Sequence, residues 1–209
     1  MRAANLRPRA WQRMLSGRRL DLIEPAALDV EIVDIAHGLA RVARWNGQTH
    51  GAHIFSVAQH SLLVEAIFSA GEPRADAAGQ MAALLHDAPE YVIGDMISPF
   101  KAVIGDAYRR IEEGLLSAIH LRFGLANPSP PALKAKIKRA DRAAAHHEAV
   151  RLAGFAAAEA NKFFGAPVTL TPQADALLAL QPVEVAQARF LARYHELDHA
   201  LTAGTSQHG

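Results

Sequence analysis

The sequence contains no cysteine. Without cysteine the chain can form no disulfide and can offer no thiolate to a metal. A metal site in this protein must therefore use imidazole and carboxylate ligands, a donor set that suits Mn, Co, Fe, Ni, Zn or Mg better than soft ions. The absence of cysteine also fits a reducing compartment, and we expect a cytoplasmic location.

The sequence also has neither a long apolar run nor an excess of one charge. No uninterrupted apolar stretch approaches the length of a membrane span, and none follows the arginine-rich start as a secretory signal requires. Lysine and arginine total 22 against 21 aspartate and glutamate, so no global field draws the chain to polyanions. We therefore expect a soluble protein with no membrane partner and no polymeric nucleic-acid partner.

The hydrophobic pattern indicates an almost entirely helical chain. The 209 residues are 50% hydrophobic, which is enough for one domain with its own core. Apolar residues recur at helical spacing along most of the chain. This spacing predicts helices over residues 34–44, 54–70, 73–87, 106–123, 131–153 and 182–199.

The ends of the chain differ from this helical domain, which we expect to span residues 34–201. Residues 1–33 are expected to form a basic arm followed by a short irregular or strand segment, with β-branched residues at Val30, Ile32 and Val33. A transit peptide is the alternative for the arm. Residues 202–209 are expected to be a frayed tail.

A histidine beside an aspartate, His86-Asp87, closes an apolar stretch. The pair places an imidazole nitrogen and a carboxylate oxygen at almost the same point, which is half of a divalent-cation site. His60 upstream shares its helix face with the apolar residues three before and four after it. Asp141 downstream lies near an apolar stripe, where a carboxylate is costly unless it is paired or bound to metal. We expect the four residues to converge on one cation.

Each outer residue also has a simpler explanation. A single inward histidine such as His60 is usually a core residue with a satisfied hydrogen bond. Asp141 has Arg139 and Arg142 close by on its own helix, so a surface salt bridge would also explain it. The presence of all four candidates in one chain favours the metal hypothesis.

The order and the helical placement of His60, His86-Asp87 and Asp141 resemble the HD-domain phosphohydrolases, in which such residues bind a divalent metal. The chain is similar in particular to the bacterial 5′-deoxynucleotidases of that superfamily. The similarity covers roughly residues 35–150. It is carried by the segments Arg44-Trp45, Ser56 to Ser61, His86 to Glu90, Gly94-Asp95, Ser98 to Lys101 and Lys138 to Asp141.

The resemblance implies roles for five further residues. Glu90 and Asp95 match acidic residues implicated in catalysis beside the metal, Arg44 matches a phosphate ligand, and Trp45 matches an aromatic wall beside the sugar. Lys101 would add positive charge near the phosphate. The alternatives are a helix-surface carboxylate for Glu90, a helix C-terminal arginine for Arg44 and a plain surface lysine for Lys101.

The resemblance further implies an all-α helical bundle around a single metal ion, a homodimer and a small nucleotide substrate. The expected reaction is metal-dependent release of phosphate from a (deoxy)nucleoside 5′-monophosphate. The alternatives are another HD hydrolase acting on a nucleoside triphosphate or a phosphodiester, and a non-catalytic nucleotide-binding regulator.

Three features of the sequence bear on these alternatives. The segment between Trp45 and His60 is rebuilt and carries two extra histidines, His50 and His53, so the substrate preference stays open. No Gly-Tyr-Pro follows the His-Asp pair, which disfavours the cyclic-dinucleotide phosphodiesterases. The second histidine pair of a two-metal version is also missing before Asp141, which favours one metal ion.

Overall fold

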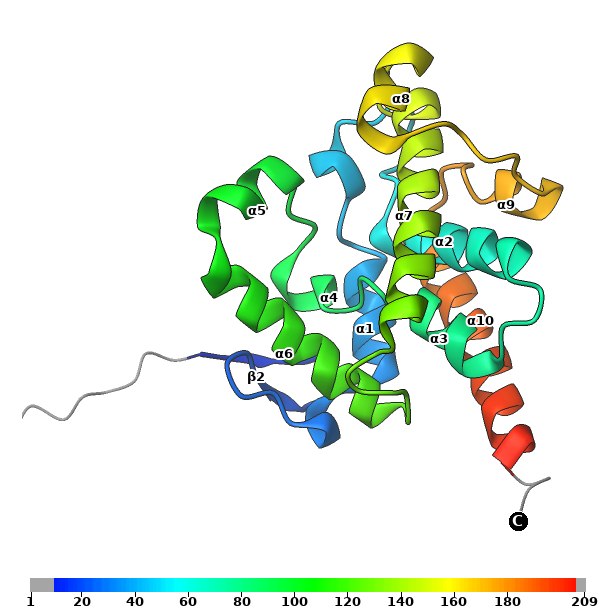
Figure 1. Cartoon of the computed structure of the whole chain (residues 1–209). Helices are drawn as coiled ribbons and strands as arrows, with labels where there is room; N and C mark the ends of the chain where they lie inside the picture. Colours follow the sequence, from blue (N-terminus) through cyan, green and yellow to red (C-terminus); the bar gives the residue numbers. More distant parts are fainter. Residues whose placement is uncertain (1–9, 206–209) are drawn as a thin grey trace, which may run out of the picture.

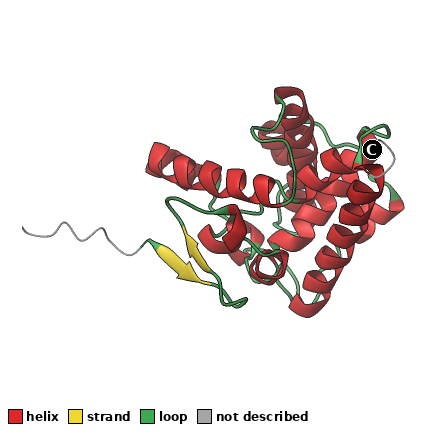
Figure 2. Cartoon of the chain, turned by 90° about the horizontal axis from the view of Figure 1, so that it is seen from below, coloured by secondary structure: helices red, strands yellow, loops and turns green. Residues whose placement is uncertain are grey.

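The chain folds into a bundle of helices with one small β-hairpin at its edge (Figures 1 and 2). The structure, a computed structural model, describes residues 10–205, and the first nine residues of the predicted arm and the last four of the predicted tail lie outside them. In chain order the elements are β1 (Trp11–Arg13), β2 (Arg19–Asp21), η1 (Ala27–Asp29), α1 (Ile32–Leu39), η2 (Arg44–Gly47), α2 (Val57–Gly71), α3 (Ala77–Leu84), α4 (Glu90–Ile93), α5 (Ser98–Ile104), α6 (Asp106–Arg122), α7 (Pro131–Arg151), α8 (Ala157–Phe164), α9 (Pro172–Ala176) and α10 (Val183–Thr205).

The mostly helical fold predicted from the sequence is confirmed, but several boundaries differ. Residues 20–33 do contain part of a strand, at their start and not at the β-branched positions. This strand, β2, pairs antiparallel with β1, with Gln12 opposite Leu20. Ile32 and Val33, two of the β-branched residues that suggested the strand, begin α1 instead. The last helix continues to Thr205, beyond its predicted end at residue 199.

Within residues 10–205, no helix is both long and apolar enough to cross a membrane.

Helix α2 packs against α3, α7 and α10 (Figure 1). Most of its residues are buried, including Leu63, Val64 and Phe68. A helix that is buried on nearly every side belongs to the core of a domain. His60 lies in the first turns of this helix and is completely buried, so its imidazole reaches the interior of the bundle.

The short helix α4 is held in place by close packing against α1. A Cβ atom added at Gly38 of α1 would lie 2.7 Å from the carbonyl oxygen of Tyr91 and 2.8 Å from its Cβ atom. Only glycine therefore lets the two helices approach this closely. Because α4 begins at Glu90, this contact also sets the position of the Glu90 side chain.

Gly38→Ala is expected to destabilise the protein by about 1–3 kcal/mol, because backbone atoms of α4 must move to accept the new methyl group. Urea unfolding measures this change. Gly114→Ala, in helix α6, is the control. A Cβ atom added at Gly114 would meet only side-chain atoms of Pro25, at 3.9 Å. That control should be neutral or stabilising by up to about 1 kcal/mol. Equal stability of the two variants would contradict the role of the α1–α4 contact.

Candidate metal centre

His86 and Asp87 lie in a turn between α3 and α4. Helix α3 ends at Leu84, and the next helix begins after Pro89, a residue that disfavours helical backbone just before it. Neighbours within a helix point about 100° apart, whereas neighbours in a turn can face the same side. The turn brings His86 Nε2 to 3.3 Å from Asp87 Oδ2.

The start of α2 places His60 next to the Arg44-Trp45 pair. Ser56 caps the helix, and its Oγ accepts a hydrogen bond from the backbone N–H of Gln59. An isolated antiparallel bridge joins Ser56 to Ala43, directly before Arg44. This backbone pairing holds the beginning of η2 against the first turn of α2.

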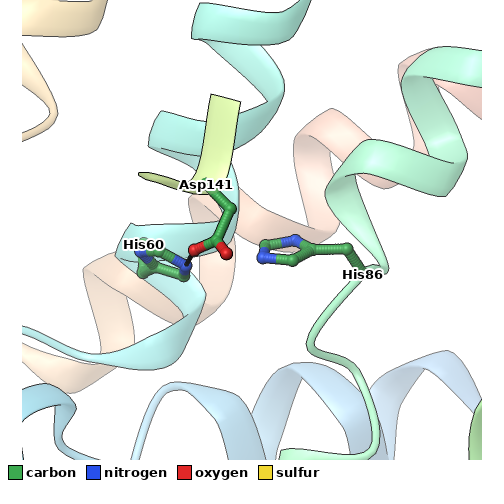
Figure 3. Close-up of side chains that lie close together, drawn as sticks. All are labelled: His60, His86 and Asp141. Carbon is green, nitrogen blue, oxygen red and sulfur yellow. Dashed lines mark ion pairs between the residues drawn. The ribbon is translucent and has the colours of Figure 1, made fainter. Parts of the chain in front are cut away.

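The structure brings three of the predicted ligands, His60, His86 and Asp141, into one candidate metal group, and Asp87 lies beside both histidines. His60 Nε2 lies 3.4 Å from Asp87 Oδ2 and 3.4 Å from Asp141 Oδ1. The ligand atoms of His60, His86 and Asp141 lie within 4.8 Å of one another, and their side chains face a common point (Figure 3). Ligands about 2.1 Å from a shared ion, at angles of about 90–110°, are themselves about 3.0–3.4 Å apart. The separations of the His60–Asp87, His60–Asp141 and His86–Asp87 pairs, 3.3 to 3.4 Å, therefore fit a transition-metal ion.

The two imidazoles each present an unused nitrogen to this point. Among the described residues, the Nε2 atoms of His60 and His86 are buried and have no hydrogen-bond partner. The other nitrogens are both engaged: His60 Nδ1 lies 2.5 Å from Glu148 Oε1, and His86 Nδ1 lies 2.9 Å from the carbonyl oxygen of Ala83. Because both partners are acceptors, each Nδ1 donates to its partner, and this orientation leaves Nε2 as the nitrogen that faces a metal.

The charges of the centre favour a cation. The carboxylates of Asp87, Asp141 and Glu148 surround His60. Burial and the Arg44 charge act to lower the pKa of His60, but the three carboxylates outweigh both and raise it well above its usual value. Burial alone would raise the pKa of Asp87 and Asp141, yet the imidazoles hold both pKa values below the usual range. The site thus stabilises positive charge where the ligands meet.

The alternative explanation for Asp141, a salt bridge to Arg139 or Arg142, is not what the structure contains. Asp141 Oδ2 instead accepts a hydrogen bond from Lys138 Nζ at 2.7 Å, while its Oδ1 faces His60. The lysine is largely exposed, with 71% of its side chain accessible. One carboxylate oxygen therefore remains available inside the centre.

Arg44 does not end a helix, because α1 stops at Leu39 and Arg44 begins η2. Its guanidinium donates to Asp95 Oδ2 at 3.0 Å and, through Nε, to Glu148 Oε2 at 3.4 Å. Burial acts to lower the pKa of Arg44, but these carboxylates raise it, so the side chain stays charged. The two bonds use two of the five N–H groups of an arginine, which leaves donors for an anion.

Glu90 lies inside the protein and not on a helix surface. It is 2% exposed, and its Oε2 has no hydrogen-bond partner among the described residues. Burial, followed by the carboxylates of Asp87 and Asp95, raises the pKa of Glu90 to about 9. Lys101 Nζ lies 3.6 Å from Glu90 Oε1, but its hydrogen bond goes to Glu112 Oε1 at 2.9 Å. Lys101 therefore lies at the edge of the centre, not within it.

Glu148 is the residue of the centre that sequence reasoning missed. It lies seven residues after Asp141 on α7, and residues two helical turns apart share one face. This spacing would have placed Glu148 on the same side of the helix as Asp141. The neighbouring histidines of α7 have other partners: His146 Nε2 lies 2.8 Å from Asn161 Oδ1, and His147 Nε2 lies 2.9 Å from the carbonyl oxygen of Val168.

The described structure is thus that of a mostly helical protein with a buried group of histidine and aspartate side chains able to hold a metal ion. The chain is 53% identical over 194 residues to the uncharacterized protein RCAP_rcc00048 of Rhodobacter capsulatus, which covers 93% of this chain and 98% of the relative. It belongs to the same family as that protein. It is also 35% identical over 113 residues to the uncharacterized protein YfdR of Escherichia coli, covering 54% of this chain and 56% of the relative. No model of a known protein family matches the chain.

Proposed function

We propose that this protein is a divalent-metal-dependent phosphohydrolase of the HD type, acting on a small nucleotide and most simply releasing phosphate from a (deoxy)nucleoside 5′-monophosphate. The observation that carries the proposal is the pair of buried, unpartnered Nε2 atoms of His60 and His86, aimed at the carboxylates of Asp87 and Asp141. Burying such nitrogens without a partner is unfavourable, and a shared ion removes that cost.

The donor set fits one Mn, Co, Fe, Ni, Zn or Mg ion held by His60, His86, Asp87 and Asp141. When bound, such an ion polarises a phosphoryl oxygen and lowers the pKa of a water. The protein supplies the rest of the chemistry through side chains that border these ligands.

Arg44 is the proposed phosphate ligand, because a guanidinium donates two parallel hydrogen bonds to phosphate oxygens. Asp95 already accepts a hydrogen bond from Arg44, so its proposed role is to orient that guanidinium. Glu90 is the better candidate for proton transfer, because it is buried, raised in pKa and free at Oε2. Two roles stay predictions: a contact of Trp45 with the sugar, and attraction of the phosphate by Lys101.

The test is metal analysis of the purified protein combined with a phosphate-release screen over nucleotides. Deoxy- and ribonucleoside monophosphates, triphosphates and a phosphodiester are supplied with each candidate metal, and the products are identified. Inorganic phosphate from a monophosphate supports the proposal. Triphosphate or a monoester as the product would assign a different HD hydrolase, and nucleotide binding without turnover would indicate a regulator.

Arg44→Ala is expected to reduce kcat/KM for a nucleoside monophosphate by about ten- to a hundredfold, the loss of roughly 1.5–3 kcal/mol from charge-assisted hydrogen bonds. Arg44→Lys should restore part of this loss, because an ammonium group cannot reproduce the two-pronged contact. Steady-state kinetics at saturating metal measure both variants.

The matched control is Arg193→Lys, since Arg193 forms a similar two-pronged pair with a buried glutamate, Glu65, away from the centre. This control should lower stability and leave kcat/KM unchanged per folded molecule. If Arg44 variants behave like the control, the phosphate is not held by Arg44.

A further inference from the structure

Glu148 is a completely buried carboxylate to which the proposed reaction assigns no step. Its two oxygens bind two different parts of the centre. Oε1 lies 2.5 Å from His60 Nδ1, and Oε2 accepts hydrogen bonds from Trp45 Nε1 at 3.0 Å and from Arg44 Nε at 3.4 Å. One side chain therefore joins a metal-ligand histidine to both residues of the Arg44-Trp45 pair.

The hydrogen-bond donors around Glu148 favour a carboxylate at this buried position. Burial acts to raise its pKa, but the charges of His60 and Arg44 and the hydrogen bonds from His60 and Trp45 lower it to about 2. A buried carboxylate is tolerated only when its oxygens are paired and hydrogen-bonded, and here all of the contacts come from residues of the centre. The hydrogen bonds of Glu148 therefore join residues of the centre and do not serve the general packing of α7.

The turn that carries Arg44 has strained backbone, which contacts of the Trp45 side chain hold in place. Trp45 and Asn46 have φ angles of 57° and 51°, in the left-handed region that disfavours residues with a Cβ atom. The Trp45 ring packs against Phe155 and Phe164, with ring centroids 5.6 and 5.9 Å away. The aromatic contacts hold the indole ring, and the hydrogen bond to Glu148 fixes its Nε1 edge.

We propose that Glu148 is a positioning residue that couples the metal ligand His60 to the Arg44-Trp45 turn, so that metal binding and phosphate binding reinforce each other. The proposal rests on the proposed function of the same centre. Toward the metal, Glu148 fixes the His60 tautomer and makes its Nε2 a stronger ligand. Toward the substrate, the same carboxylate holds Arg44 and the strained turn in the orientation that faces the ligands.

The test compares the Co²⁺ affinity of the wild-type protein, Glu148→Gln and Glu65→Gln by titration calorimetry. Glu148→Gln keeps the size of the side chain and removes its charge. It should weaken Co²⁺ binding by about ten- to a hundredfold, as is usual when the partner of a ligating histidine is altered. Glu65→Gln removes a second buried glutamate charge, also paired with an arginine, and should bind Co²⁺ within about twofold of wild type. An equal effect of the two variants overturns the proposal.

Trp45→Phe tests the coupling if Glu148→Gln does not fold. This change keeps an aromatic ring against Phe155 and removes only the donor to Glu148. It should weaken Co²⁺ binding by about two- to tenfold, the value of one hydrogen bond. Unchanged affinity would overturn the coupling.

If the wild-type protein binds no Co²⁺, the proposed function itself fails. If it binds Co²⁺ and releases phosphate while Glu148→Gln binds as well as wild type, only the role of Glu148 fails.

Discussion

Asp87→Ala is expected to abolish phosphohydrolase activity and to lower the metal content of the purified protein to background. Asp87 Oδ2 lies 3.4 Å from His60 Nε2 and 3.3 Å from His86 Nε2, so it faces both imidazole ligands. Removing it takes one anionic donor from a four-ligand set and leaves the two histidines with Asp141 alone. We expect a loss of at least about a thousandfold in metal-dependent turnover, more than 4 kcal/mol of transition-state stabilisation. Elemental analysis and phosphate release measure the two effects.

The control for this variant is Asp76→Ala, at the opposite end of α3 from the turn that carries Asp87. Asp76 caps α3, with Oδ1 accepting a hydrogen bond from the backbone N–H of Gly79 at 2.8 Å. Losing this cap should cost about 0.5–2 kcal/mol of stability and leave the metal content unchanged. If Asp87→Ala retains full metal content, the ion is not held as we propose.

The helical pattern predicted the helices that carry His60 and Asp141, because their burial follows directly from the spacing of apolar residues. It placed His86 and Asp87 inside the helix over residues 73–87, whereas they lie in the turn after α3. His60 and Asp141 each share a helix face with such residues, and α2 and α7 are close to the predicted ranges. Helix α3 begins at Ala77, later than predicted from Pro73, because the side chain of Asp76 caps it. A capping aspartate is a signal that the sequence does contain.

The β-branched residues Ile32 and Val33 suggested a strand within residues 20–33, but they lie in a helix for a different reason. β-Branched residues favour strands only weakly, and tertiary packing overrides that preference. Helix α1 buries Ile35 and Leu39 and packs against α4 and α10, contacts that reward a helix over this segment. The sequence pattern alone cannot weigh this long-range packing against local preference.

The arrangement around Arg44 was beyond sequence reasoning because it depends on residues far along the chain. A left-handed backbone at Trp45 is unfavourable in isolation and exists here with an indole ring held by Phe155 and Phe164. Helix α8, which supplies Phe164, was not predicted. Glu148 could have been placed on the face of Asp141, but its contact with the Arg44-Trp45 turn could not.

Glu90→Gln is expected to reduce turnover by roughly two orders of magnitude or more while metal content stays near wild type. The amide keeps the shape of the buried side chain and cannot exchange a proton with a reacting group, whereas Glu90 has a free Oε2 and a pKa raised to about 9 by burial, Asp87 and Asp95. Kinetics and elemental analysis on the same preparation measure the two quantities. Glu112→Gln is the matched control, because Glu112 accepts a hydrogen bond from the same Lys101 and is not one of the proposed ligands. That control should keep both turnover and metal. Loss of metal in Glu90→Gln would instead make Glu90 a ligand, and unchanged turnover would move proton transfer to Asp95.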